Sequence, residues 1–436
     1  MQTITVREYA RLTTVPLQES TLDHAVVSAA DFDELCALNE NSAEGMVSFL
    51  HQESRTSLRL RHYVGILETT SGTCIEILPK TCEDAMNTEE TTQRERRLLM
   101  RMLMAALNVP SYEGPEASIE LSHTPLSEWI IRRFLLELHN LLKRGLRFGY
   151  ERVAEERPFL RGSLDVRRQL IQAPQRRHLF HVRHDIFSAN RPEHRLLRKA
   201  LDRCASATGD VENARLAAPL RGIFADIPPS TALAADFRQW SRGRHMTHYQ
   251  AVRPWCELVL GEYMPFAFAG NLRGLSMLFP MERLFEAYVT ACLRRQLRLG
   301  AVLTAQTSGK WLCRLKDTPF FALQPDIRIQ YKGIECILDT KWKKISGSAA
   351  HFGINQSDVY QIFAYGQKYL GGEGDMALIY PKHRGFPAQL EAAPFRFSEK
   401  LGFWALGWDL DQDYLVVPPD CALREFFMET EASLES

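Results

Sequence analysis

Asp326, Asp339 and Lys341 stand out because two carboxylates and an ammonium at one place could do chemistry. All three lie in residues 323–344, which read LQPDIRIQYKGIECILDTKWKK. Two apolar, alternating runs flank a central Lys-Gly pair in this stretch. Whether the three side chains meet depends on how these runs fold.

The Lys332-Gly333 pair predicts a two-residue hairpin loop, because glycine supplies the positive φ that such loops need. In that register the position numbers of paired residues share one sum, so Asp326 lies opposite Asp339. Lys341 shares their face, because side chains alternate along a strand. The other face is apolar and carries the pairs Ile327–Leu338, Ile329–Cys336 and Tyr331–Ile334.

Directly opposed carboxylates repel each other, which gives a purely structural hairpin no advantage. A divalent cation removes the repulsion, and Mg²⁺ favours carboxylates together with several waters. The ammonium of Lys341 could orient or help deprotonate a water and stabilise charge developing on a phosphoryl group. Asp326 and Asp339 are therefore predicted Mg²⁺ ligands of a phosphodiester hydrolysis site. A plain amphipathic hairpin with an exposed polar face is the alternative.

Two helices could add residues to this site. The segment MERLFEAYVTACLRRQLRLG, residues 281–300, carries Glu286, which could face the metal or lie on the helix surface. The segment SDVYQIFAYGQKY, residues 357–369, places Gln361 and Tyr365 four residues apart on one helix face. An ordinary amphipathic helix would show the same spacing.

The elements around the hairpin indicate an α/β fold. After the 281–300 helix, strands are predicted at 301–305, 311–316, 323–331 and 334–341, a helix at 357–370, and strands at 375–382 and within 403–410. This order is typical of a central sheet covered by helices. We therefore predict a nuclease-type domain over residues 271–436, with a mixed sheet flanked by helices.

The rest of the chain divides into two regions, giving an α/β (α+β) multidomain protein. Residues 1–115 mix α and β, with a helix at 31–40, a hairpin of 57–69 with 73–80, and a long helix at 87–107. Residues 116–270 are mainly helical, with helices at 125–145 and 190–209. Strand-like segments at 157–166 and 178–189 interrupt them. The Pro- and Gly-rich residues 108–118 mark the boundary between the two regions.

Composition is that of a soluble protein. The chain has 436 residues, with 53 Lys plus Arg and 53 Asp plus Glu, so no overall basic excess favours nucleic-acid binding. No apolar run is long enough for a membrane helix, and the first residues have no secretory pattern. The 9 cysteines form no CxxC pair, which is typical of a reducing compartment. We expect a cytoplasmic protein.

Two further groups of residues, three histidines and three arginines, each have a structural and a functional interpretation. His178, His181 and His184 recur every three residues. On a strand they alternate between faces and bind no common metal, whereas on a helix they could. Exposed arginines at 55, 59 and 61 could act as arginine fingers in a partner's nucleotide site, although a solvated strand face is the simpler interpretation. Most cysteines lie in apolar runs and are expected to be buried packing residues.

The quoted motifs resemble a known family. The PD at 325–326, the DTK at 339–341 and the downstream Gln361 and Tyr365 resemble the RecB-like branch of the PD-(D/E)XK nuclease superfamily. A wider set of segments resembles the McrC family in the same order from about residue 60 to 382. These segments are YVGILET…IEILPK (63–80), RPFLRGSLDV (157–166), VRHDIFSANRPEHRLLRKAL (182–201), FPMERLFEAYV (279–289) and ILDTKWKK (337–344).

The resemblance implies an endonuclease subunit of a modification-dependent restriction system. Its partner would be a hexamer of a McrB-like AAA+ GTPase that recognises methylated cytosine, and the N-terminal part would insert into that ring and stimulate GTP hydrolysis. The C-terminal domain would cut double-stranded DNA with Mg²⁺, with a nuclease-domain dimer as one possible assembly. Where the motifs match, the resemblance implies that Asp326 and Asp339 are metal ligands and that Lys341 is the catalytic lysine. Glu286, Gln361 and Tyr365 become accessory residues.

Two other functions fit some of the same observations. The chain could be a non-catalytic adaptor that only tethers and stimulates a AAA+ ring. It could also be a stand-alone RecB-like repair nuclease that cuts from DNA ends. The chain has no GxxxxGK[ST] phosphate loop, so nucleotide hydrolysis must come from another chain.

Overall fold

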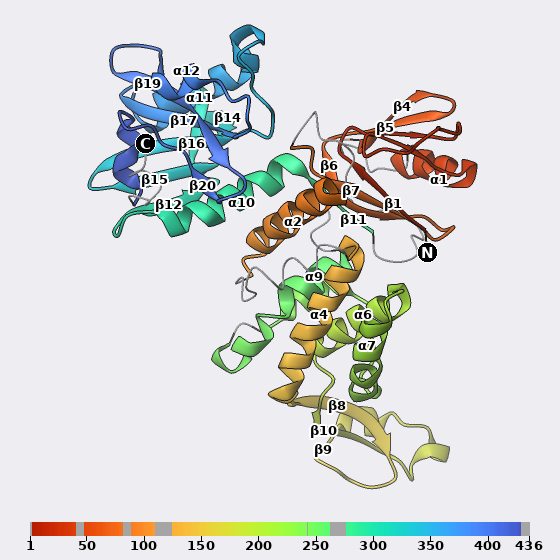
Figure 1. Cartoon of the computed structure of the whole chain (residues 1–436). Helices are drawn as coiled ribbons and strands as arrows, with labels where there is room; N and C mark the ends of the chain where they lie inside the picture. The colour runs from red at the N-terminus through yellow and green to blue at the C-terminus, as the bar shows by residue number, and fades with distance from the viewer. Residues whose placement is uncertain are drawn as a thin grey trace. The chain divides into compact units, whose positions relative to one another are not determined.

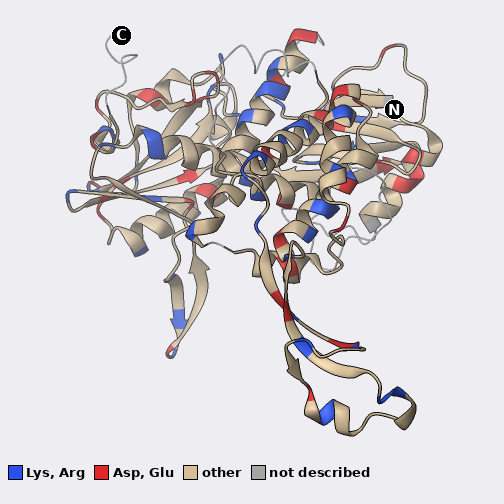
Figure 2. Cartoon of the chain, turned by 90° about the horizontal axis from the view of Figure 1, so that it is seen from below, with Lys and Arg blue, Asp and Glu red and all other residues tan. Residues whose placement is uncertain are grey.

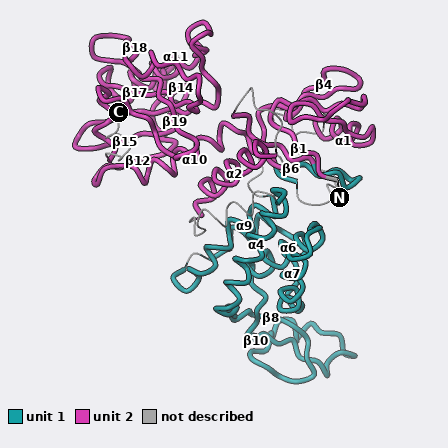
Figure 3. The backbone as a smooth tube through the Cα atoms, viewed as in Figure 1, with its two compact units in different colours: residues 1–2, 66–74, 124–277 teal, residues 3–65, 75–123, 278–436 magenta. Residues whose placement is uncertain are grey.

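The computed structural model shows a mixed α/β protein with several sheets, drawn in Figure 1. It describes residues 2–40, 48–81, 89–109, 124–241, 243–261 and 276–428. The chain forms two compact units, coloured in Figure 3. Unit 1 comprises Met1–Gln2, Ile66–Cys74 and Thr124–Met277, and unit 2 comprises Thr3–Gly65, Ile75–His123 and Leu278–Ser436. The predicted boundaries near residues 115 and 270 lie outside the described residues, so the three-domain division stays a prediction.

The N-terminal elements confirm the predicted helices and the pairing of residues 63–68 with 73–78, but the single strand predicted at 57–69 is two strands in different sheets. The helices are α1 (Ala29–Glu40) and α2 (Glu89–Ala106). The strands are β1 (Gln2–Arg7), β2 (Arg11–Thr13), β3 (His24–Val26), β4 (Leu50–Ser54), β5 (Ser57–Leu60), β6 (Tyr63–Glu68) and β7 (Thr73–Leu78). One sheet has the order β3-β2-β5-β4, and another has the order β1-β7-β6-β11, where β11 is Met277–Pro280. Strands of three residues carry too little alternation to be predicted.

Unit 1 is largely helical, as predicted, but it also carries a sheet. Its helices are α4 (Leu126–Lys143), α5 (Val166–Leu170), α6 (Pro192–Ala207), α7 (Val211–Ile223), α8 (Leu233–Gln239) and α9 (Arg253–Leu260). The sheet has the order β8-β10-β9, from β8 (Gly149–Arg157), β9 (Ser163–Leu164) and β10 (Phe180–Ser188). Strand β8, GYERVAEER, was not predicted because charged residues occupy both of its faces.

The C-terminal part of unit 2 holds a seven-stranded mixed sheet. Its order is β12-β15-β16-β17-β19-β18, and β20 also pairs with β19. Strand β16 runs antiparallel to β15 and parallel to β17, which runs parallel to β19. The strands are β12 (Val302–Ala305), β15 (Ile327–Tyr331), β16 (Ile334–Thr340), β17 (Gly374–Pro381), β18 (Phe395–Arg396), β19 (Leu401–Asp409) and β20 (Tyr414–Leu415), and the helices are α10 (Met281–Gln296), α11 (Gln356–Tyr369) and α12 (Ala388–Ala392).

The strand predicted at 323–331 is wrong in one respect. A separate hairpin, β13 (Lys310–Leu315) with β14 (Thr318–Leu323), ends at Leu323, and β15 begins only at Ile327. Pro325 in the interval cannot donate a ladder hydrogen bond, which favours the break. The break leaves Asp326 just before the first paired residue.

Both faces of the central sheet are buried near β16. Helix α11 covers one face, where Ile337 packs in a core cluster with Ile362, Tyr365 and Leu378. Cys336 and Leu338 are buried on the opposite face. By strand alternation Ile337 shares the face of Asp339 and Lys341. The sequence interpretation of this face as polar therefore holds only at its ends, because α11 covers its middle. No helix among the described residues is long and apolar enough to cross a membrane.

Candidate active site

The hairpin that carries the predicted residues has the predicted register. Ile327 pairs with Leu338, Ile329 with Cys336 and Tyr331 with Ile334. Lys332 and Gly333 form its turn with φ of 49° and 82°, as a two-residue loop with positive φ at both positions requires. This register brings Asp326 and Asp339 to the same end of the hairpin.

Thr340 fixes the carboxylate of Asp326. Its backbone N–H and its hydroxyl both donate to Asp326 Oδ2, at 2.7 and 2.8 Å. Burial raises the pKa of Asp326 above its usual range, although the two hydrogen bonds from Thr340 oppose the increase. No hydrogen bond within the described chain engages its other oxygen, Oδ1. Asp326 is therefore oriented and still has an oxygen available to a ligand.

Asp339 is almost fully buried, with 1% of its surface exposed. Burial and the nearby charge of Asp326 raise its pKa above the usual range, and Lys341 opposes this increase. The cost of burying an unneutralised carboxylate is the cause, since low dielectric disfavours the charged form. The two aspartates are thus a like-charge pair, and Lys341 is the one cation paired with it among the described residues.

A chain of hydrogen bonds runs from Asp339 to helix α11. The ammonium of Lys341 donates to Asp339 Oδ2 and, at 3.2 Å, to Gln361 Oε1. Gln361 Nε2 donates to the Tyr365 hydroxyl at 2.8 Å, and that hydroxyl donates to the carbonyl of Gln324 at 3.1 Å. Lys341 and two of the predicted accessory residues are therefore held in one network.

The same carboxylates keep Lys341 charged. Burial acts to lower the pKa of Lys341, but the charge of Asp339, its hydrogen bond and the charge of Asp326 raise it above the usual value. An ammonium in this setting stays protonated at neutral pH. It can orient a water or a phosphate oxygen, and it is a poor proton acceptor.

Glu286 on α10 lies within electrostatic reach of the pair. Burial and the charge of Asp326 raise its pKa to about 7. Its Oε1 accepts a hydrogen bond from Gln306 Nε2 at 3.1 Å. The structure therefore brings all six predicted residues to one end of the hairpin, although it shows no direct contact of Glu286 with either aspartate.

The residues present fit a hard divalent cation. Asp326 and Asp339 supply carboxylate oxygens, and their raised pKa values show negative charge that this chain leaves largely unneutralised. Oxygen donors of this kind suit Mg²⁺, which usually keeps several waters. The described residues contain no group of three or more His, Cys, Asp or Glu arranged around a metal position. A metal here would therefore be held by two carboxylates, with water completing its coordination.

Three further residues belong to this cluster and were not predicted. Thr340 orients Asp326, as described, and its place between Asp339 and Lys341 was the available signal. Asp358 pairs with Lys343, and its charge acts on Asp339. Glu282 adds negative charge near Asp326. Asp358 lies three residues before Gln361, and Glu282 four before Glu286, so helical spacing could have found both.

Trp342, which follows Lys341, is held by the N-terminal part of unit 2. Its Nε1 donates to Glu8 Oε1 at 2.8 Å, and its ring lies 5.2 Å from that of Phe285. Burial raises the pKa of Glu8 to about 7. These contacts fix the backbone that follows Lys341.

The other residues singled out in the sequence have structural settings. His181 and His184 lie on strand β10, as predicted, and are 3.5 and 3.3 Å from Glu156 and Glu155. Arg59 is 3.6 Å from Glu53. Arg55 lies in the exposed β4–β5 turn. The cysteines of the apolar runs are buried, as expected, at positions 74, 204, 256, 292, 336 and 421, while Cys82 lies outside the described residues.

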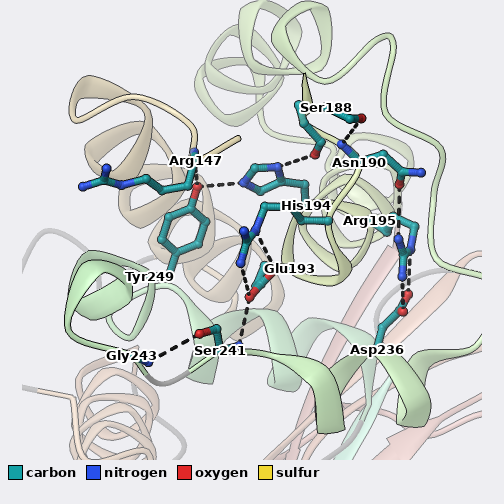
Figure 4. Close-up of polar contacts among 12 residues, drawn as sticks. Arg147, Ser188, Asn190, Glu193, His194, Arg195, Asp236, Ser241, Gly243 and Tyr249 are labelled. Carbon is teal, nitrogen blue, oxygen red and sulfur yellow. Dashed lines mark hydrogen bonds and ion pairs between the residues drawn. The ribbon is translucent and has the colours of Figure 1, made fainter. Parts of the chain in front are cut away.

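Unit 1 contains a second buried polar cluster, shown in Figure 4. Glu193 accepts hydrogen bonds from Ser241 N at 2.9 Å and from the Arg191 guanidinium at 3.3 Å. His194 Nε2 lies 2.7 Å from the Tyr249 hydroxyl, and its Nδ1 lies 2.6 Å from the Ala189 carbonyl. The carbonyl can only accept, so Nδ1 carries the proton of a neutral imidazole.

The remaining carboxylate of this cluster is also neutralised. Arg195 donates to both oxygens of Asp236, at 3.1 and 2.5 Å, and Ser230 donates to Oδ2 at 2.7 Å. Burial acts to raise the pKa of Asp236, but these hydrogen bonds and the Arg195 charge lower it below its usual range. Every carboxylate here has a cation, which is typical of a structural network.

Comparisons with known proteins identify the family of this chain. The family model described as "McrBC 5-methylcytosine restriction system component" matches residues 58–381. A chain from the refined half-complex of a tetradecameric assembly of Thermococcus gammatolerans McrB AAA+ hexamers with bound McrC is 19% identical, with a TM-score of 0.65 over 94% of this chain and 95% of that one. A chain of the Thermococcus gammatolerans McrBC complex is 20% identical, with a TM-score of 0.48 over 67% of this chain and 88% of that one. No curated protein matches. Because the family model matches well over half of this chain, the chain belongs to the McrBC 5-methylcytosine restriction system component family.

Proposed function

We propose that this chain is the endonuclease subunit of a McrBC-like modification-dependent restriction system and hydrolyses phosphodiester bonds of double-stranded DNA with Mg²⁺. The observation that carries the proposal is the like-charge pair of half-buried Asp326 and buried Asp339, beside the ammonium of Lys341. A structural cluster would neutralise both carboxylates. A cation-dependent hydrolase needs them unneutralised, and perturbed pKa values of this kind mark functional sites more often than structural ones.

The chain's residues divide the work as follows. Asp326 and Asp339 would hold Mg²⁺, which when bound supplies Lewis-acid polarisation of the phosphate and lowers the pKa of a water. Thr340 keeps the Asp326 carboxylate oriented. The ammonium of Lys341 orients the attacking water and stabilises the negative charge that grows on the phosphoryl oxygens, an electrostatic contribution of about 2.7–4 kcal/mol when one such donor is removed from an enzyme.

Gln361 and Tyr365 act through Lys341. The amide of Gln361 accepts from the ammonium, and the Tyr365 hydroxyl in turn accepts from that amide. This arrangement leaves Lys341 a single orientation between Asp339 and α11. Glu286, with its pKa near 7, can exchange a proton at neutral pH and is the candidate acid for the departing oxygen.

The partner proposed for this chain is a McrB-like AAA+ GTPase hexamer. The solved structure that this fold resembles is a McrB AAA+ assembly with bound McrC. The chain has no phosphate-binding loop of its own, so GTP hydrolysis belongs to the partner, and we propose that this chain stimulates it. The partner, rather than this charge-balanced chain, then supplies most of the affinity for modified DNA.

The test is cleavage of a closed circular plasmid carrying methylated cytosine by this chain with its GTPase partner, Mg²⁺ and GTP. GTP hydrolysis is recorded in the same reactions. Wild type is expected to linearise the plasmid only with partner and GTP, and Asp339→Asn to stimulate GTP hydrolysis without cutting. Glu373→Gln removes an exposed carboxylate that pairs with Lys400, and it should cut like wild type.

Each other outcome has a meaning. Cutting by Asp339→Asn at the wild-type rate contradicts the site. Stimulated GTP hydrolysis without cutting by wild type, on plasmids carrying a panel of cytosine modifications, supports the adaptor function. Cutting of linear DNA alone, without a partner, supports a stand-alone end-dependent nuclease.

A further inference from the structure

The hairpin β13–β14 leaves unit 2 at the edge of the sheet that carries the candidate active site. Strand β14 ends at Leu323, and Asp326 follows after Gln324 and Pro325. Because β15 is antiparallel to β16, this start of β15 lies beside the end of β16, where Asp339 is found. We call residues 310–323 the arm. Its root is therefore next to the predicted metal ligands.

The arm is ordered although little covers it. All of its residues are exposed except Leu323 at the base. In Figure 2 it is the short two-stranded ribbon that stands out from the part of the chain bearing the C-terminus. An isolated two-stranded hairpin is marginally stable in water. An arm held out in this way is typical of an element that contacts another molecule.

Helix α11 anchors the root. The hydroxyl of Tyr369 donates to the carbonyls of Leu323 and Thr307, at 2.9 and 3.0 Å, so it ties together the two ends of the arm. Burial acts to raise the pKa of Glu335, and its partner Arg328 and the charge of Lys310 lower it. Lys310 thus lies near the polar face of β15 and β16, which also leads to Asp339.

The arm carries three cations that no ion pair neutralises within the described chain. They are Lys310 and Arg314 on β13 and Lys316 in the turn, against one acid, Asp317. Lys310 and Arg314 share a face because they lie four positions apart on one strand, along which side chains alternate. Some other exposed cations of unit 2 do have carboxylate partners, as Lys400 has Glu373 and Arg396 has Asp375.

The opposite face of the arm is apolar. Cys313 pairs with Phe320 and Trp311 with Ala322, so their side chains share one face. Leu315 adds to it, and its side chain is 67% exposed. Ribbon elements of this width enter the major groove of DNA, where apolar side chains contact thymine methyl groups while cations contact phosphates.

We propose that the arm grips the DNA duplex next to the scissile phosphate, with Lys310, Arg314 and Lys316 contacting phosphates. The proposal rests on the proposed nuclease function and extends it to the substrate-binding surface. The positive charge of the arm favours DNA over a second copy of this chain. The cations lie on the side of the sheet where the candidate site would meet the negatively charged phosphate backbone.

The experiment measures binding of the full-length chain to a fluorescently labelled DNA duplex, with Ca²⁺ in place of Mg²⁺ so that cutting does not interfere. The triple variant Lys310→Ala, Arg314→Ala, Lys316→Ala is expected to lose at least about tenfold in affinity near 50 mM salt, and the slope of log K against log salt should fall by about one per cation removed. The double variant Lys310→Arg, Lys316→Arg keeps all three charges and should bind like wild type.

A control variant removes three positive charges at the opposite end of the strands from Asp339. Lys332 precedes β16, while Arg396 and Lys400 lie beside the start of β19. Since β16 and β19 run in the same direction, these residues are far from Asp339 along the strands. Their triple alanine variant should change affinity less than about twofold, because unpaired phosphate contacts, not net charge, carry the effect.

Several results would overturn the arm proposal. Equal losses in the arm and control variants would do so, as would no measurable binding by wild type at low salt. Sedimentation velocity tests the other occupant: an arm variant that dissociates a dimer but binds DNA normally makes the arm a protein interface. Failure of cleavage with intact arm-dependent binding would instead count against the nuclease function alone.

Discussion

Two buried polar clusters of this protein follow opposite electrostatic rules. In the polar cluster of unit 1 around Glu193, His194 and Asp236, each carboxylate faces a cation. Arg195 and Ser230 lower the pKa of Asp236 despite its burial. In unit 2, burial and mutual repulsion raise the pKa of Asp339 and Asp326, with only Lys341 paired to them. Asp339 and Asp236 are both buried, with 1% and 6% of their surfaces exposed, so exposed surface alone does not explain the opposite shifts.

The difference shows how structure and function can be told apart without a ligand. A neutralised cluster contributes to folding and would be destabilised by loss of any member. A cluster left with excess like charge costs folding free energy unless a further ion binds, so its retention indicates chemistry. The predictions below break or sharpen this contrast, from the largest expected effect to the smallest.

Removing the single cation of the unit 2 cluster should abolish catalysis. Lys341→Gln is expected to reduce kcat for plasmid cutting by about 10²–10³-fold, as loss of one preorganised charge donor does. Lys343→Gln is the matched control, since Lys343 pairs with Asp358 rather than Asp339. Equal losses in the two variants would mean that overall charge, not placement, matters.

Breaking the unit 1 cluster should cost stability and leave chemistry alone. Asp236→Asn leaves Arg195 without its charged partner, which is expected to lower the free energy of unfolding by about 3–5 kcal/mol for a buried pair and by less here because Arg195 is partly exposed. Urea unfolding measures it. At urea concentrations below the unfolding transition, kcat of the variant for plasmid cutting should match that of wild type. A stable variant with lost activity would make this cluster functional.

The two clusters should respond to pH in opposite directions. The pKa of Asp339 is raised in the folded chain, so its contribution to stability is present below its unfolded pKa and lost as pH rises. In metal-free buffer, Asp339→Asn should therefore stabilise the chain more at pH 8 than at pH 5, by about 1–3 kcal/mol.

The pKa of His194 is lowered by burial, so its contribution has the opposite sign. That contribution is present above the ordinary histidine pKa and is lost as pH falls. The destabilisation caused by His194→Gln should accordingly shrink by about 1 kcal/mol between pH 8 and pH 5. Parallel pH trends for the Asp339 and His194 variants would remove the contrast between the clusters.

The smallest effect on cutting is expected at Tyr365, which reaches Asp339 only through Gln361 and Lys341. Tyr365→Phe keeps the ring in the core and removes the hydroxyl that holds Gln361. We expect kcat to fall by about tenfold, as for other groups that orient a catalytic residue through one intermediate. Tyr369→Phe, on the same helix but bonded to the arm root, should spare kcat and raise KM.

The sequence predicts the site better than it predicts its surroundings. The Lys332-Gly333 turn and the alternation on both sides determine the register, so the meeting of Asp326 with Asp339 and Lys341 follows from local rules. The strands β8, β13 and β14 escape prediction in whole or part. Their exposed, mixed faces lack the burial that creates alternation.

Long-range contacts also lie beyond sequence reasoning. Trp342 and Glu8 are far apart in the chain, and only the fold joins them. Asp358 and Glu282 have helical spacing to predicted residues, but that spacing has many surface explanations. Like-charge crowding around Asp339 becomes visible only once all of its neighbours are placed.

The most direct test of the account is whether the unit 2 pair binds a divalent cation. Thermal or urea unfolding of the full chain, with and without Mg²⁺ near neutral pH, needs neither the partner nor the right DNA. Wild type and Glu373→Gln should gain about 2–3 kcal/mol when Mg²⁺ exceeds its dissociation constant by about a hundredfold. Asp339→Asn should gain almost nothing. An equal gain in all three proteins, or none in wild type, would contradict the assignment of Asp326 and Asp339 as metal ligands.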